Sequence, residues 1–321
     1  MKNNYLIKIC LLLCLTSVIS ACGGGGGSSE PTVKIADIDG DGISDDKDPD
    51  IDGDGASNEN DMDPNDPDFI AYKLETITFT DQNLADCIAA VYAPDVLINQ
   101  IKSVYCPGEE INSLEGIDEL IFLQNLVLYN NTFSDLTPVA SLANLKLLYI
   151  GNAELSFKSN IVDLTPLTSL YALTELRFTN SDVSSIDALS DLNLLEVLFL
   201  NKNMISDISP LSGLQQLKRL FINENSISNI TPLSDLTNLS ELEVSKNSVK
   251  DLTPLSNITS LINLNLRDNS ITSVTTILNW QELPLSLNLE DNAIACADNQ
   301  ALIDKANNQG SDYIYDDSTC I

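Results

Sequence analysis

The stretch "LFINENSISNITPL", Leu220–Leu233, decides the fold because nearly the same string occurs twice more at a fixed distance. It appears earlier as "LFLNKNMISDISPL" (198–211) and later, at the same spacing, as "LEVSKNSVKDLTPL" (242–255). Alternation in a short strand points the two apolar residues of L-x-L to one side and the middle residue to the other. One repeat cannot bury its own leucines, whereas stacked repeats can. The period therefore predicts one coil of a solenoid.

The repeat covers residues 104–295. Most repeat starts follow one another at a period of 22, as Leu220 follows Leu198. The step from Leu148 to Leu176 is 28, which indicates an insertion around 154–160, and the last step is 23. The starts are Val104, Leu126, Leu148, Leu176, Leu198, Leu220, Leu242, Leu264 and Leu287.

Two further positions recur with the same period. An Asn that follows most starts at a constant offset is expected to satisfy backbone groups at the turn after each strand, and Ala153 and Ser181 interrupt this ladder. Prolines on the opposite side favour short turns or 3₁₀ segments there. The asparagines are Asn131, Asn203, Asn225, Asn247, Asn269 and Asn292; the prolines are Pro138, Pro166, Pro210, Pro232 and Pro254.

The L-x-L-x-x-N and I-x-D-I-x-P-L patterns resemble leucine-rich repeats, and in particular the internalin-type class with this period. The resemblance implies an α/β solenoid with short parallel strands on its concave face, turns or 3₁₀ segments on its convex face, and a surface that binds proteins. An open stack needs covered ends. We expect an N-terminal cap at 69–103 with a helix begun by Thr80 or Asp81, and a C-terminal cap at 296–321 with a helix within 297–308.

The N-terminus has the features of a targeting segment. Lys2 and Lys8 flank the start of an apolar run at 9–15, so residues 1–21 are predicted to be a secretion signal. Ile19-Ser20-Ala21 before Cys22 resembles a bacterial lipobox, which implies a lipid on Cys22 and anchoring to a membrane. Gly23 in place of Asp resembles Gram-negative lipoproteins of the outer membrane. The predicted location is the bacterial cell envelope, facing either the periplasm or the exterior.

The remaining cysteines, Cys87, Cys106, Cys296 and Cys320, are even in number, as expected for disulfides in an exported chain. Four cysteines allow three pairings. We favour the pairing of Cys87 with Cys106 and of Cys296 with Cys320, because each pair flanks one end of the repeats.

The charge of the chain restricts its partners. It has 47 acidic and 16 basic residues, a net charge of -31, and no His. Such a chain repels nucleic acid, so no nucleic-acid partner is expected. The absence of His excludes nucleophiles activated by His and ordinary His-containing zinc sites.

After a Gly-rich tether at 22–36, residues 37–68 are extremely acidic and contain two matched loops. Each loop has oxygen donors at positions 1, 3, 5, 9 and 12 and a Gly at position 6, the arrangement that wraps Ca²⁺. The segment resembles thrombospondin type 3 repeats and is predicted to be a calcium-stiffened spacer. The candidate ligands are Asp37, Asp39, Asp41, Ile43 (carbonyl), Asp45 and Asp48, then Asp50, Asp52, Asp54, Ala56 (carbonyl), Asn58 and Asp61.

The middle residues of the L-x-L units should point outward on the concave face. They read Tyr105, Val127, Tyr149, Arg177, Phe199, Phe221, Glu243, Asn265 and Asn288, an aromatic ridge that Arg177 interrupts and that then turns polar and acidic. Exposed aromatics beside an Arg are typical of binding hot spots. The candidate partner-binding residues are Tyr105, Tyr129, Tyr149, Arg177, Phe199 and Phe221.

The sequence therefore predicts a monomeric, non-enzymatic interaction protein, and leaves open whether its partner is a protein or a glycan. One alternative is a structural envelope protein with Ca²⁺-dependent self-association. An enzyme using carboxylates such as Glu241 and Glu243 on glycans is disfavoured, because a solenoid surface implies no pocket and no lone acid is visibly buried.

Overall fold

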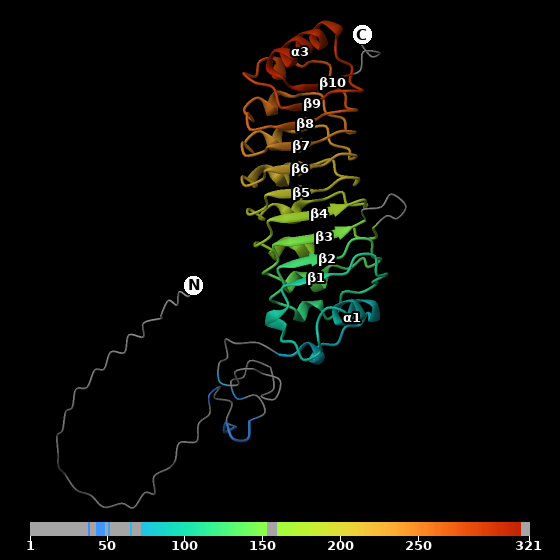
Figure 1. The fold of residues 1–321 in the computed structure, drawn as a ribbon, viewed down its shortest axis with the longest axis vertical. Helices are drawn as coiled ribbons and strands as arrows, with labels where there is room; N and C mark the ends of the chain where they lie inside the picture. The colour runs from blue at the N-terminus through green and yellow to red at the C-terminus, as the bar shows by residue number, and fades with distance from the viewer. Residues whose placement is uncertain are drawn as a thin grey trace, which may run out of the picture.

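The computed structural model describes residues 38, 43–48, 51, 65, 72–152 and 159–315. Predictions for Cys22, Cys320 and most of the Asp-rich segment lie outside these residues. Within them, ten strands form one parallel sheet in the order of the chain, β1 to β10. Figure 1 shows the strands stacked like rungs between α1 at one end and α3 at the other. The predicted leucine-rich-repeat solenoid is confirmed.

The strands are short, as expected for one L-x-L unit per coil. Their bounds are β1 Ser103–Tyr105, β2 Asn125–Val127, β3 Leu147–Gly151, β4 Glu175–Thr179, β5 Val197–Phe199, β6 Arg219–Phe221, β7 Glu241–Glu243, β8 Asn263–Asn265, β9 Ser286–Asn288 and β10 Asp312–Ile314.

The leucines that start the repeats line up across the sheet. Leu198 pairs with Leu220, and Leu220 with Leu242; all three are fully buried. Leu148 pairs with Leu176 although the step between them is the longest in the array, so the longer repeat keeps the register. Every predicted repeat start occupies this one internal column, and the period is therefore the length of one coil.

The opposite side of the solenoid consists mainly of 3₁₀ turns, as predicted. Five of them, η4, η5, η7, η8 and η9, have a proline at their first positions, where the missing N–H of proline costs nothing. The 3₁₀ segments are η1 Leu74–Thr76, η2 Ile98–Gln100, η3 Ile117–Glu119, η4 Thr137–Ser141, η5 Thr165–Ser169, η6 Asp187–Leu189, η7 Ser209–Gly213, η8 Thr231–Leu233 and η9 Thr253–Leu255. In the next coil a short α-helix, α2 (Thr275–Leu278), replaces the 3₁₀ turn.

Asparagines join neighbouring coils after most of the repeat strands. The side-chain carbonyl of Asn225 accepts from the Ile205 N–H at 3.0 Å, and its amide donates to the carbonyls of Leu200 and Ile222, both at 3.0 Å. Near Ser181 the ladder is irregular, as predicted. The buried Oδ1 of Asn203 and Oγ of Ser181 have no hydrogen-bond partner in the part of the chain that the structure describes.

The N-terminal cap is built around the helix α1 (Gln82–Ala89). Asp81 is its N-cap: one carboxylate oxygen accepts from the N–H groups of Asn83 and Leu84 at 2.9 and 3.1 Å. The other accepts from Asn112 and Ser113 in the first coil at 2.7 and 3.3 Å. Desolvation raises the pKa of Asp81, but these four donors together lower it below its usual value.

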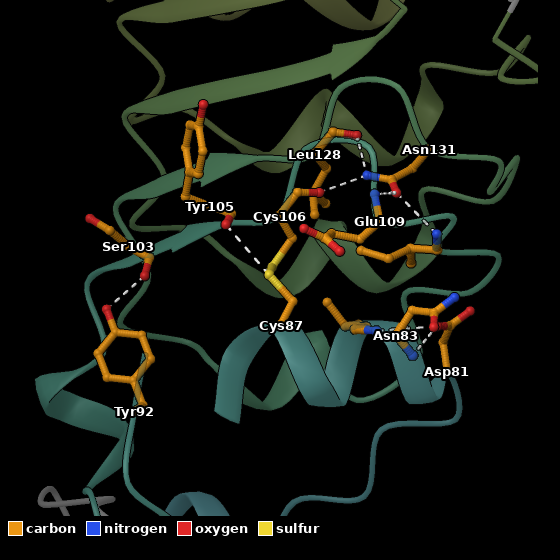
Figure 2. The surroundings of a disulfide bond; sticks show 12 residues. Asp81, Asn83, Cys87, Tyr92, Ser103, Tyr105, Cys106, Glu109, Leu128 and Asn131 are labelled. Atoms are coloured by element: carbon orange, nitrogen blue, oxygen red, sulfur yellow. Dashed lines mark hydrogen bonds between the residues drawn. A yellow bond between two sulfur atoms is a disulfide. The ribbon is translucent and has the colours of Figure 1, made fainter. Parts of the chain in front are cut away.

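The predicted disulfide between Cys87 and Cys106 is present and connects α1 to the residue after β1 (Figure 2). Figure 2 also shows Asn131 beside it, donating to the carbonyls of Cys106 and Leu128. The disulfide thus joins the cap to the first coil covalently, and Asn131 joins the first coil to the second.

The C-terminal cap contains the predicted helix, α3 (Cys296–Gln309), which ends at Gly310 in the left-handed conformation. Cys296 is its first residue; pairing with Cys320 is not tested, because Cys320 lies outside the described residues. The sequence did not predict β10, which follows α3 and pairs with β9. This strand covers the last edge of the repeat sheet.

Candidate binding surface

The outward residues of the repeats form one column across the concave sheet, as predicted. Strand register places Tyr149 beside Arg177, Arg177 beside Phe199, and Phe199 beside Phe221. Val127, also predicted to point outward, is only 8% exposed, because it lies between the tyrosines of the two neighbouring strands. That position of the column therefore offers little surface.

Arg177 continues the aromatic ridge, and the expectation that it interrupts the ridge is wrong. Its guanidinium lies 4.5 Å from the ring centre of Tyr149 and 4.3 Å from that of Phe199. Flat guanidinium groups stack on aromatic faces through cation–π attraction. Tyr149, Arg177 and Phe199 therefore form one continuous stack.

Glu175 holds this stack in place. Its Oε1 accepts from the Tyr149 hydroxyl at 2.7 Å and from Arg177 at 2.7 Å. Burial, followed by the hydrogen bond to the Glu175 carboxylate and its charge, raises the pKa of Tyr149 to about 12. Tyr149 thus stays a neutral donor at physiological pH, and its ring has a fixed position.

Two phenylalanines extend the stack into the next strand. The rings of Phe199 and Phe221 lie 4.0 Å apart at an interplanar angle of 6°. Arg219 lies against both rings, at 5.9 and 5.3 Å, and pairs with Glu241 at 2.5 Å. We call Tyr149, Arg177, Phe199 and Phe221 the aromatic stack; all four are partly exposed on the concave face.

Tyr105 and Tyr129 lie at the N-terminal end of the same face. Tyr105 is 62% exposed, and its hydroxyl lies 3.2 Å from the hydroxyl of Tyr129. The hydrogen bond with Tyr105 raises the pKa of Tyr129. The buried Val127 separates this tyrosine pair from the aromatic stack, so the predicted residues form two groups on one face.

Beyond Phe221 the concave face becomes polar, as predicted. Glu243, Asn265 and Asn288 continue the column across β7, β8 and β9. The sequence did not predict that Glu243 would be desolvated. Burial raises the pKa of its carboxyl and the charge of Glu241 adds to this, while hydrogen bonds with Asn265 and Ser245 act in the opposite direction.

Most candidate calcium ligands lie outside the described residues, and Ile43, Asp45 and Asp48 lie within them. Asp45 accepts a hydrogen bond from the N–H of Ile38 at 3.1 Å, and Asp48 is 7% exposed. No group of three or more acidic, Cys or His side chains suited to a metal occurs among the residues that the structure describes.

No helix in the described ranges is long and apolar enough to cross a membrane. The N-terminal segment predicted to carry the lipid lies outside those ranges.

Comparisons with known proteins agree with this architecture. The family described as "Leucine Rich repeats (2 copies)" matches residues 193–235. The chain matches no curated protein sequence.

Among solved structures, internalin C2 from Listeria monocytogenes is 27% identical in sequence; the match covers 64% of this chain and 92% of internalin C2, with a TM-score of 0.59. The functional domain of InlJ from the same organism, which includes a cysteine ladder, is 20% identical; the match covers 78% of this chain and 62% of the InlJ chain, with a TM-score of 0.57. The fold of this chain is therefore that of the leucine-rich-repeat domains of internalins.

Proposed function

We propose that this chain is a non-enzymatic interaction protein of the bacterial cell envelope that binds a protein ligand on its concave face. The observation that carries the proposal is the aromatic stack, four partly exposed side chains held at fixed positions on a parallel sheet. Solenoids present extended concave surfaces of this kind to their partners. Aromatic residues and Arg are enriched in the parts of interfaces that contribute most binding energy.

The rigidity of the stack supports this function. Glu175 fixes Tyr149 and Arg177, and Phe221 packs on Phe199, so little side-chain entropy is left to lose on binding. Charge pairing of Arg177 with Glu175 leaves its guanidinium plane between the rings. A ligand would meet a preorganised apolar surface with polar edges.

The test is the double substitution Phe199→Glu with Phe221→Glu. It places two charges where an apolar ligand surface would pack, and both side chains point away from the core, so the variant should fold. We expect it to lose the protein ligand captured by the wild type while its melting temperature falls by only the few degrees that loss of the Phe199–Phe221 ring stack accounts for. The matched control is Tyr171→Glu, an exposed aromatic outside the strands, at 57% exposure. Undiminished capture by the double variant refutes the proposal.

We further propose that residues 37–68 bind Ca²⁺ and act as a spacer. The support is the regular spacing of carboxylates, the hydrogen bond from Ile38 to Asp45 across the first loop, and the low exposure of Asp48. Calorimetric titration with Ca²⁺ should show binding to the wild type. The double variant Asp39→Asn, Asp52→Asn should lose this binding, and the control double variant Asp66→Asn, Asp68→Asn should keep it. Equal Ca²⁺ binding by both variants contradicts this assignment.

The lipid anchor on Cys22 is proposed from the lipobox-like sequence that precedes it. Radiolabelled palmitate should label the wild-type chain and leave Cys22→Ala unlabelled. Protease treatment of intact cells then separates an external from a periplasmic location.

A further inference from the structure

A polar hollow of about 180 Å³ lies on the concave face beyond the aromatic stack. Its walls come from β7, β8, β9 and β10, and its floor includes the two buried leucines of β7 and β8. The polar wall is formed by Glu241, Glu243, Asn263, Asn265, Ser286 and Asn288. Apart from Ile314 on β10, the side chains around the rim offer mainly hydrogen-bond acceptors and donors.

The glutamates on the concave side of the sheet differ in their charge partners. On the outer face from β4 to β9, Glu175 pairs with Arg177 at 2.7 Å, Glu241 with Arg219 at 2.5 Å, and Glu290 with Arg267 at 3.1 Å. Glu243 lines the hollow and forms no ion pair with a Lys or Arg of the described chain. Glu175, Glu241 and Glu290 each have an arginine partner, whereas Glu243 has no counter-ion within the described chain.

The environment of Glu243 makes an added cation favourable. Asn265 and Ser245 hydrogen-bond to its carboxylate, but burial outweighs them and raises the pKa of the carboxyl. The ionised form is therefore less stable here than in water, and a counter-ion would stabilise it. Glu241 lies beside it in the same strand and adds negative charge, only partly offset by Arg219. The net charge of -31 of the whole chain also attracts cations to this surface, at longer range.

Building on the proposed function, we propose that this hollow accepts an arginine side chain of the protein ligand. A guanidinium has five N–H donors in one plane, so it can pair with the Glu243 carboxylate and also donate to the amide oxygens of Asn265 and Asn288. The chain itself provides the precedent in Arg177, which pairs with Glu175 next to an aromatic ring.

The geometry also gives an expected spacing in the ligand. The centre of the hollow lies two strands beyond Phe221, a distance of about 10 Å at about 4.8 Å per strand. An extended peptide covers about 3.3 Å per residue. A ligand segment that crosses the strands would therefore place its arginine about three residues from the residue that packs on Phe221.

The test uses a small probe, so that it does not depend on identifying the ligand. Nα-acetyl-arginine methylamide is titrated into the purified protein, and the backbone amide resonances of Asn265 and Asn288 are followed by NMR. The neutral isostere Nα-acetyl-citrulline methylamide is titrated in parallel. We expect saturable shifts with the arginine probe and at least tenfold weaker binding of the citrulline probe.

The matched variants are Glu243→Gln and Glu282→Gln, the latter an exposed acid outside the strands. Glu243→Gln should weaken arginine binding at least tenfold, whereas Glu282→Gln should leave it unchanged. Because the Gln variant removes a desolvated charge, it should melt no lower than the wild type, so lost binding cannot be attributed to unfolding.

Equal binding of citrulline, shifts confined to other strands, or no saturable binding up to tens of millimolar overturns the inference. Competition by Ca²⁺ without any preference for arginine would identify a metal site and also overturn it. The proposed function fails separately: it depends on whether the Phe199→Glu, Phe221→Glu variant loses the protein ligand, and neither residue lines the hollow.

Discussion

Strands β4–β6 and strands β7–β9 have the same interior and opposite exteriors. Inside, Leu176, Leu198 and Leu220 of the first group and Leu242, Leu264 and Leu287 of the second are all at most 1% exposed. Outside, one residue further along each strand, the first group carries Arg177, Phe199 and Phe221, whereas the second carries Glu243, Asn265 and Asn288.

This difference shows that neighbouring residues of one strand are subject to different physical constraints. The inward leucine must fit the leucines of the coils on both sides, so its identity hardly changes along the column. The outward residue meets solvent and its two outward neighbours only. The fold is therefore specified by one set of positions, and the binding chemistry is free to vary in the set between them.

The largest expected effect tests the interior. Leu220→Ala leaves a cavity in a fully buried column and should lower the free energy of unfolding by about 2–5 kcal/mol. Urea unfolding followed by circular dichroism measures this change. Leu285→Ala, at a site 65% exposed, is the control and should stay within about 0.5 kcal/mol of the wild type. Equal losses for the two variants would contradict the assignment of inward and outward positions.

The asparagine ladder provides the next test. Asn225→Ala leaves the Ile205 N–H without its acceptor, so we expect a loss of about 1–3 kcal/mol. It also removes one of two asparagine donors from the Leu200 and Ile222 carbonyls, which keep the amides of Asn203 and Asn247. Asn203→Ala should cost less, because the Oδ1 of Asn203 has no partner in the described structure. The same denaturation experiment compares the two, and a larger loss for Asn203→Ala would refute the ladder as the source of this stability.

A smaller effect is expected on the outer column. Phe221→Ala removes the ring stacked on Phe199, an interaction worth about 0.5–1.5 kcal/mol beyond buried area. In the polar half, Glu243→Gln should be neutral or slightly stabilising, because burial raises the pKa of this carboxyl and its charged form disfavours the folded state at neutral pH. Calorimetric melting of both variants tests the contrast; a Glu243→Gln variant less stable than Phe221→Ala contradicts it.

The smallest effects concern exposed aspartates before the convex turns. Each aspartate accepts hydrogen bonds from the hydroxyl and the N–H of the residue two positions later, and these bonds lower the pKa of its carboxyl. The pairs are Asp135 with Thr137, Asp207 with Ser209, and Asp251 with Thr253. Their contribution to stability is fully present above about pH 5 and is lost as the pH falls below 3.8 toward their folded pKa values.

Melting temperatures measured between neutral and acidic pH should therefore fall at the acid end. Asp207→Asn should be less sensitive to acid, since a neutral amide oxygen can accept the same bond, as Asn229 does from Thr231 at 2.9 Å. An unchanged acid sensitivity in Asp207→Asn would exclude this carboxylate as a contributor.

Much of the fold could be predicted because it depends on residues that repeat. The register of the leucine column, the prolines in the 3₁₀ turns and the Asp81 N-cap all follow local rules. The Cys87–Cys106 bond followed from proximity in sequence. The strand β10 could not be predicted, because the segment around Tyr313 lies outside the repeat and pairs only because β9 offers an open edge.

The candidate surface was predictable in its positions and less so in its contacts. Register alone places Phe199 beside Phe221, but the insertion of the Arg177 guanidinium between two rings depends on its pairing with Glu175. The covering of Val127 and the desolvation of Glu243 likewise depend on the size and direction of neighbouring side chains, which the period does not specify.

Hydroxyl-radical footprinting of the native protein tests the separation of inner and outer positions most directly. Tyr105, which is 62% exposed, should be oxidised faster than Phe199 and Phe221, which are partly exposed. Phe178, which is fully buried one residue after Arg177, should remain unmodified until the protein unfolds. Oxidation of Phe178 at the rate of Phe199 in the folded protein would contradict the account.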